Sequence, residues 1–158
     1  MLGLLDKKLG VPYNKIEEDF MSNLSASLED YLELICNLLE TSESVKAVEL
    51  SRKLNVSRAS VSEALAKLAE KELILYEGHK GITITEKGLK KAKEVISKHN
   101  TLTSFFENTL CMSIEQASNN ACKIEHVISD ELFERIKLFQ AYISSHQDII
   151  NDFKKGIK

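Results

Sequence analysis

The segment ACKIEHVISD contains three side chains that can bind a metal ion or move a proton. Glu125 and His126 follow Cys122 by three and four positions. In a helix, this spacing places both side chains one turn away from Cys122, on the same face. A thiol, a carboxylate and an imidazole on one face are either unrelated polar residues beside a core or groups that bind something together.

Three other candidate ligands lie next to apolar positions in segments with helical periodicity. Asp30 and Glu33 stand one turn apart, and His99 falls inside an apolar stripe. Each has an ordinary explanation: helix capping for Asp30, a surface position for Glu33 and a satisfied core position for His99. Cys122 can likewise be a small buried hydrophobe. Packed together, however, the acidic groups would be costly to bury unless a cation compensated their charge.

The donor types restrict the metals that such a site would bind. Imidazole, carboxylate and thiolate together favour Fe(II), Mn(II), Co(II), Ni(II) or Zn(II) over Ca(II) and Mg(II), which prefer oxygen ligands. A site of this kind requires three separate helical segments to pack against one another.

The N-terminal helices can be assigned from apolar periodicity and capping residues. A helix is predicted from a Ser27 cap to the ETSES segment, a short helix in VKAVELSRKL, and a longer helix in RASVSEALAKLAEKELI after the turn NVS. Two β-rich runs at 73–76 and 82–85 flank a glycine-containing turn. They predict a hairpin with His79 and Lys80 at its tip.

The C-terminal half is predicted to be helical. Thr85 is placed to cap a helix over 86–110, Ser113 to restart a helix that carries the ACKIEHVISD segment, and Ser129 to cap a helix over 130–143. The fold class is therefore mostly α with one small β-hairpin. The predicted division of the chain is an unassigned N-terminal extension (1–26), a winged helix-turn-helix domain (27–90), a helical domain (91–143) and a C-terminal tail (144–158).

Composition favours a cytoplasmic protein. The 158 residues include one Pro and six Gly, as expected of a largely helical chain of one domain or two small ones. No apolar run approaches the roughly 20 residues that a membrane span needs. The start, MLGLLDKKLG, is too short and too quickly charged for a signal peptide. Three Cys cannot all pair, which favours a reducing compartment.

The distribution of charge favours nucleic-acid binding, although the net charge of −3 does not. Residues 46–98 contain 12 basic and 7 acidic residues, a local charge of +5, whereas the rest of the chain contains 9 basic and 17 acidic residues, a local charge of −8. A basic middle between acidic ends is typical of a nucleic-acid module joined to something else.

The order helix, turn, helix, hairpin predicts a winged helix-turn-helix, in which the second helix enters the major groove by its N-terminal end. Short serines there permit close approach, Arg58 can bind a guanine edge, and Glu63 can accept from a cytosine amine. Basic residues, among them Lys53, are placed for phosphate. The predicted DNA contacts are Ser57, Arg58, Ser60, Ser62, Glu63, Lys67, His79 and Lys80. A small helical bundle, or a winged helix that binds only protein, is the alternative.

The motifs LEDYLELI, KH and CKIEHVISDE, in this order around a winged helix, resemble the metal-dependent repressors of the diphtheria toxin repressor and manganese transport regulator family. The resemblance covers roughly residues 27–139. It implies that the helical domain binds metal and dimerises. The implied activity is transcriptional repression by a homodimer on a palindromic operator. A divalent metal is expected to activate the repressor, which would control iron or manganese homeostasis.

The resemblance also implies a ligand set. Asp30 and Glu33 match the manganese branch, Cys122 matches the iron branch, and the remaining ligands match both. The implied metal ligands are Asp30, Glu33, His99, Cys122, Glu125 and His126. Thr103 and Ser118 stand where an acidic residue and a His complete an ancillary site in iron-type members, so that site is expected to be weak.

The expected cofactor is accordingly Mn(II) or Fe(II). With a Cys122 thiolate, one divalent ion would leave a surplus of negative charge. Two ions per chain, or a thiol that stays protonated, would balance the charge better, and two ions are favoured. A metal-dependent hydrolase is disfavoured, because there is no Gly-rich phosphate loop and no evident nucleophile–base pair. The chain is therefore not expected to be an enzyme. The remaining alternative is a metal-free regulator or interaction module, with Cys122 as a redox switch.

Overall fold

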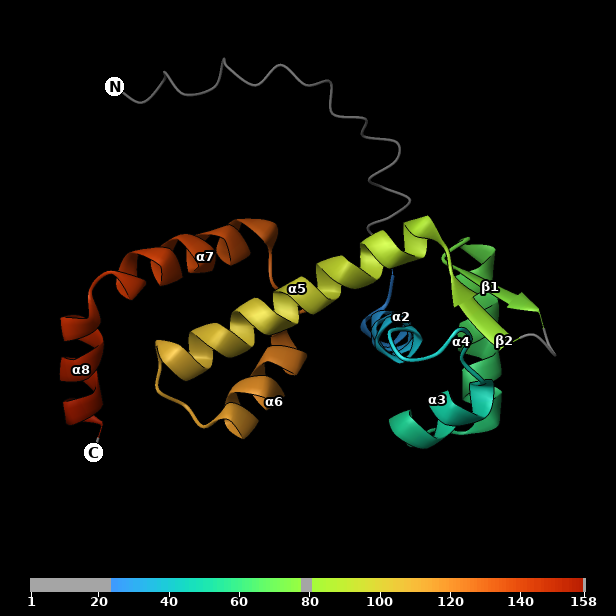
Figure 1. Cartoon of the computed structure of the whole chain (residues 1–158), viewed down its shortest axis with the longest axis horizontal. Helices are drawn as coiled ribbons and strands as arrows, with labels where there is room; N and C mark the ends of the chain where they lie inside the picture. The colour runs from blue at the N-terminus through green and yellow to red at the C-terminus, as the bar shows by residue number, and fades with distance from the viewer. Residues whose placement is uncertain (1–23, 78–80, 158) are drawn as a thin grey trace, which may run out of the picture.

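The computed structural model describes residues 24–77 and 81–157. The described elements begin with α2 (Ala26–Leu39), α3 (Ala47–Leu54), α4 (Arg58–Glu70), β1 (Ile74–Glu77) and β2 (Gly81–Ile84). It continues with α5 (Glu86–Asn108), α6 (Ile114–Ile124), α7 (Asp130–Ser144) and α8 (Gln147–Gly156). Figure 1 shows α5 crossing the molecule, with α2–α4 and the hairpin at one end and α6–α8 at the other. The predicted fold class is confirmed.

The hairpin belongs to the winged helix formed with α2, α3 and α4. Its strands pair antiparallel, with Ile74 opposite Ile84, and each strand is shifted by one residue from its predicted position. Val45, which precedes α3, forms an isolated antiparallel bridge with Ile82 of β2. The Val45 N–H donates to the Ile82 carbonyl at 3.0 Å, and the Ile82 N–H donates to the Val45 carbonyl at 2.8 Å. These bonds fix the hairpin against the α2–α3 connection. The predicted tip residues His79 and Lys80 lie outside the described residues.

The N-cap of α2 lies two residues before Ser27, so the predicted cap is wrong. Ser25 is the N-cap: its hydroxyl accepts a hydrogen bond from the Leu28 N–H at 3.4 Å. The sequence Ser-Ala-Ser offers two capping hydroxyls, and Ala26, a strong helix former, lets the helix extend to the earlier one. Asp30 therefore lies beyond the first turn, where its carboxylate cannot serve as a cap. The caps predicted at Thr85, Ser113 and Ser129 are confirmed.

Two apolar clusters form the core. The larger one joins α2, α3, α4, the hairpin and the start of α5, and the predicted core positions Val61, Leu65 and Leu68 are fully buried in it. The smaller one surrounds Leu102 of α5 and includes Ile128, which follows α6. Helix α5 thus contributes to both clusters and mechanically connects them.

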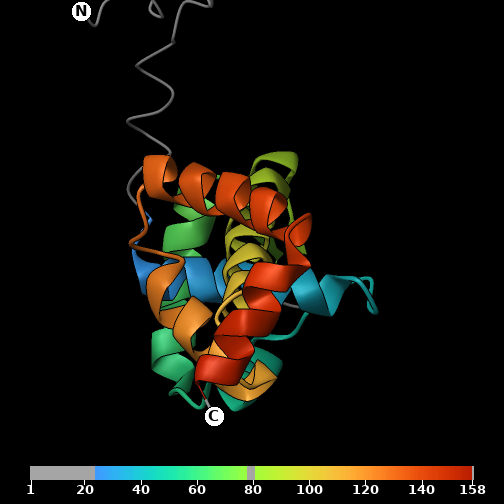
Figure 2. The ribbon, with the colours of Figure 1, turned by 90° about the vertical axis from the view of Figure 1, so that its left-hand side faces the viewer.

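The predicted division at residue 90 lies inside α5, which has 23 residues and is shared by both halves. The tail, left unassigned beyond residue 143, forms the end of α7 and the whole of α8. Figure 2 looks at the molecule from this end, with α8 running obliquely across the front. Within residues 24–77 and 81–157, no helix combines the length and apolar character that crossing a bilayer requires.

The start of α5 is clamped against the junction between α4 and β1. The Thr85 hydroxyl accepts from the Gly88 N–H at 3.0 Å and lies 2.8 Å from the Glu72 carbonyl, to which it donates. A Cβ on Gly88 would lie 1.9 Å from the Leu73 carbonyl oxygen, well inside van der Waals contact. Only glycine permits this approach, and the approach fixes the direction in which α5 leaves the winged helix.

Gly88→Ala should therefore destabilise the fold by at least about 1–3 kcal/mol, because the backbone must move to accept the methyl group. Urea unfolding followed by circular dichroism measures the change. Gly156→Ala is the matched control, since a Cβ there meets nothing within 4 Å, and it should leave stability unchanged or slightly raised. Equal stability of both variants would contradict the close packing at Gly88.

Candidate metal centre

Three helices bring candidate ligands to one place. Asp30 comes from α2, His99 from α5, and Glu125 and His126 from the turn that follows α6. The packing of Ile128 against Leu102 holds this turn against α5. Residues separated by almost a hundred positions in the sequence therefore lie side by side.

The tightest group consists of Asp30, Glu125 and His126, each of which offers one donor atom within 4.8 Å of the others. The His126 Nε2 atom lies 2.9 Å from Asp30 Oδ1 and 3.3 Å from Glu125 Oε1. Neither contact has the direction of a hydrogen bond, and among the described residues both His126 Nε2 and Glu125 Oε1 are buried without a hydrogen-bond partner. Such atoms are unusual in a folded protein, and a bound cation would satisfy them.

His99 joins this group through Glu125. Its Nδ1 lies 2.6 Å from Glu125 Oε2, and its Nε2 lies 3.3 Å from the Ser118 hydroxyl. The two oxygens of Glu125 therefore face different histidines. Ser118 can donate or accept, so it suits either tautomer of His99. Ser118 stands at the position where an ancillary histidine ligand was expected to be missing, and its hydroxyl contacts His99.

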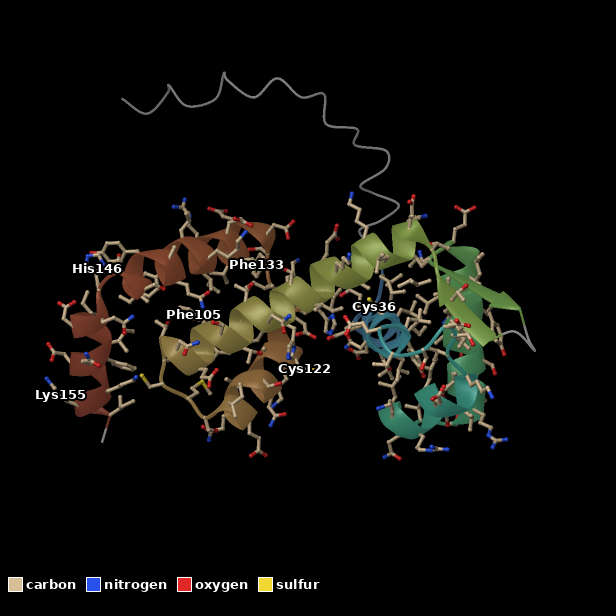
Figure 3. All side chains as sticks on the ribbon, viewed as in Figure 1. Cys36, Phe105, Cys122, Phe133, His146 and Lys155 are labelled. Carbon is tan, nitrogen blue, oxygen red and sulfur yellow. The ribbon has the colours of Figure 1, made fainter. Side chains whose placement is uncertain are left out.

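Glu33 and Cys122 lie close to the centre without a hydrogen bond or ion pair to it among the described contacts. Burial raises the pKa of Glu33, and the charges of Glu125 and Asp30 raise it further against the lowering effect of both histidines. Cys122 is exposed as a residue, yet the protein around its sulfur, followed by the charges of Glu125 and Asp30, raises the pKa of the thiol. Figure 3 shows Cys122 near the end of α6 that is closest to α2.

Sequence reasoning missed Glu29. This carboxylate is only 8 % exposed, and its Oε2 accepts a hydrogen bond from His126 Nδ1 at 2.7 Å. Its Oε1 forms an ion pair with Lys91 of α5, also at 2.7 Å. A signal was present, because Glu29 precedes the buried Leu32 by three positions and so occupies a core-facing position of α2.

The negative groups around His126 favour its charged form. Burial alone would lower the pKa of His126, but the hydrogen bond to Glu29 and the charges of Asp30 and Glu125 together raise the pKa above its ordinary value. Positive charge is therefore stabilised at this point of the structure. A divalent cation at the Nε2 side of the ring would experience the same attraction.

The predicted DNA-reading residues of α4 lie on its exposed surface. The hydroxyl of Ser57 caps the helix by accepting from the Ser60 N–H at 3.1 Å. Glu63 pairs with Lys67 at 2.7 Å, and this hydrogen bond and charge lower the pKa of Glu63. Arg58 and Ser62 line a hollow of about 430 Å³ together with Ala47 and Val48 of α3 and Val61 of α4.

Two family models match the chain. Residues 23–82 match the model described as the iron dependent repressor N-terminal DNA binding domain. Residues 85–151 match the model described as the iron dependent repressor metal binding and dimerisation domain. The first match ends within β2, and the second begins at Thr85, the N-cap of α5.

Similar proteins are regulators. An uncharacterised HTH-type transcriptional regulator of Methanocaldococcus jannaschii is 40% identical over 117 residues, which are 73% of this chain and 94% of that protein. The HTH-type transcriptional regulator MntR of Oceanobacillus iheyensis is 30% identical over 132 residues, 84% of this chain and 89% of its own length.

Solved structures agree in fold. A manganese-dependent transcriptional repressor in complex with manganese has a TM-score of 0.66 and 29% identity, over 73% of this chain and 53% of that one. The manganese regulator SloR has a TM-score of 0.65 and 32% identity, over 73% and 54%. The chain thus spans about half the length of these two proteins.

The thiols of Cys122 and Cys36 should differ in reactivity. In chelator-treated protein, iodoacetamide should modify exposed Cys122 much faster than Cys36, which is buried in α2, as peptide mass spectrometry measures. If the Cys122 sulfur binds metal, added Mn(II) should slow its modification and leave the rate at Cys36 unchanged. An unchanged rate at Cys122 would remove it from the ligand set.

Proposed function

Since this chain belongs to the iron-dependent repressor family, we propose that it is a DNA-binding transcriptional repressor that a divalent transition metal activates and that controls metal homeostasis. The observation that carries the proposal is the pair of buried, unpartnered atoms, Glu125 Oε1 and His126 Nε2, beside Asp30. They form a donor set between the DNA-binding half and the half that matches a dimerisation domain.

The proposed ligands are Asp30, Glu33, His99, Cys122, Glu125 and His126. Asp30, Glu125 and His126 make up the first group of donors. His99, on the other side of Glu125, belongs to a second group with Glu33 and Cys122. The charge of His99 lowers the pKa of Glu33, and the charge of Glu33 raises the pKa of Cys122, so these groups lie near one another. Because each Glu125 oxygen faces a different histidine, this carboxylate is suited to bridge two ions, and we propose two per chain.

The proposed metal is Mn(II) or Fe(II). The carboxylate-rich set around Asp30 suits Mn(II), and the thiol of Cys122 with two imidazoles also suits Fe(II). Among similar structures, the manganese-dependent repressor holds manganese and ScaR has bound Zn²⁺. When bound, a divalent cation supplies the positive charge that lets these carboxylates lie close together in a poorly solvated space.

The proposed mechanism follows from the position of each ligand. Asp30 and Glu33 belong to α2, which shares a core with recognition helix α4. Glu125 and His126 belong to the half that matches the dimerisation model. Once their mutual repulsion is compensated, Asp30 and Glu125 hold α2 against α6. In a homodimer, the contact between α2 and α6 would set the separation of the two α4 helices to that of the half-sites of a palindromic operator. The population of molecules thereby shifts towards the arrangement that fits the operator.

A repressor of this kind acts in the cytoplasm, where its operator is. The family consists of transcriptional regulators, which favours this reading over a metal-dependent hydrolase. A metal-free or redox-responsive regulator built around Cys122 is the rival that the experiments below separate. It predicts DNA binding of equal strength with Mn(II), Fe(II) or chelator.

Glu125→Ala should abolish metal-stimulated DNA binding, because it removes the bridging carboxylate. The variant protein should remain folded. The expected loss of Mn(II) affinity is at least about 10–100-fold, because removal of a group that only hydrogen-bonds to a metal-binding histidine already lowers metal affinity by that factor. Fluorescence anisotropy on an operator selected from random DNA, with and without Mn(II), measures the response. Exposed Glu115→Ala, in the first turn of α6, is the control and should behave as wild type.

Metal counting by mass spectrometry under non-denaturing, reducing conditions tests the ion number. Two Mn(II) ions per wild-type chain and fewer than two in Glu125→Ala are expected. A single ion per wild-type chain would refute the bridging role of Glu125. A normal metal response in Glu125→Ala would remove this residue from the site altogether.

Arg58→Ala should relax or change the preferred operator, because a guanidinium that reads a guanine edge contributes roughly 1–3 kcal/mol of base discrimination. Lys53→Ala, at an exposed position of α3, should weaken all sequences alike and lower the salt slope by about one. Selection from a random DNA library, repeated at several salt concentrations, distinguishes the two. The opposite pattern would mean that α4 does not read the bases.

A further inference from the structure

Glu29 lies between two cationic or proton-donating groups that come from different helices. Its Oε1 pairs with Lys91 of α5 at 2.7 Å, and its Oε2 lies 2.7 Å from Nδ1 of His126, after α6. All three side chains are largely shielded: their exposed fractions are 10% for Glu29, 19% for Lys91 and 7% for His126. These contacts form a chain, Lys91–Glu29–His126, across three elements.

The direction of the bond between Glu29 and His126 fixes the tautomer of the ring. An ionised carboxylate has no proton to donate, so Nδ1 must carry the hydrogen that Glu29 accepts. In the neutral ring, Nε2 then carries the lone pair. This atom faces Asp30 Oδ1 and Glu125 Oε1, at 2.9 and 3.3 Å. The lone pair thus points to the place where the other donor atoms gather.

Glu29 is badly placed to be a ligand in its own right. It contacts the Nδ1 side of the imidazole, whereas Asp30 and Glu125 contact the Nε2 side. Its second oxygen is already occupied by the Lys91 ammonium group. Lys91 also compensates the charge of Glu29, without which a carboxylate so deeply buried would be costly.

We propose that Glu29 is a positioning residue: through its bond to Nδ1, it holds His126 in the tautomer and orientation in which Nε2 binds metal, while Lys91 fixes Glu29. This inference rests on the proposed function, since it concerns the same centre. A metal-bound histidine commonly donates its other N–H to such a carboxylate, and loss of that partner costs about 10–100-fold in metal affinity.

Three variants test the role of Glu29. Glu29→Ala removes the acceptor and should weaken Mn(II) binding by about 10–100-fold, as electron paramagnetic resonance of free Mn(II) measures. Glu29→Gln keeps an oxygen that can accept from Nδ1 and should retain most of the affinity. Glu40→Ala, an exposed position at the end of the same helix, should bind Mn(II) as wild type does.

A purely structural role would give another pattern. If Glu29→Ala binds Mn(II) like wild type, or if Glu29→Gln loses as much affinity as Glu29→Ala, the positioning role is overturned. Wild-type protein that binds no Mn(II) would instead refute the metal centre itself. The two failures are therefore distinguishable.

A measurement on unaltered protein covers the case in which Glu29→Ala does not fold. Nitrogen-15 spectra of the histidine rings in the Zn(II)-loaded wild type should show His126 protonated at Nδ1 and metal-bound at Nε2. Metal on Nδ1 would overturn the proposal, because that atom could not donate to Glu29.

Discussion

The arrangement of the molecule depends on burying the Glu125 carboxylate, which is 2 % exposed. Removing such a charge from water costs several kcal/mol unless nearby groups compensate it. Two imidazoles face this carboxylate: His99 from α5 and the adjacent His126, which Asp30 of α2 also contacts. The balance at Glu125 is therefore a constraint on how three helices dock.

The rest of the fold connects that constraint to α4. Gly88 allows the start of α5 to contact the Leu73 carbonyl, and Thr85 bonds the same junction, so α5 leaves the winged helix in one direction. Helix α2 shares its core with α4. Neither helix can shift at the centre without carrying the winged helix with it, because packed cores do not deform continuously.

Local patterns predicted the elements well, since apolar periodicity and capping hydroxyls act over a few residues. They could not choose between Ser25 and Ser27, because both hydroxyls satisfy the same local rule. The contact of Glu29 with His126 spans 97 positions and leaves no local trace except a carboxylate at a core-facing position. Conversely, spacing alone placed Cys122 on the ligand face but could not show that this residue is exposed.

Charge bookkeeping links Cys122 to the number of ions in the proposed centre. Lys91 compensates Glu29, so the carboxylates of Asp30, Glu33 and Glu125 remain to be balanced. Burial, and then the charges of the surrounding carboxylates, raise the pKa of the Cys122 thiol, which favours its neutral form beside these groups. A metal-bound sulfur is deprotonated, and with a thiolate the four negative charges match two divalent cations. Occupancy of the second position and deprotonation of Cys122 are thus expected to occur together.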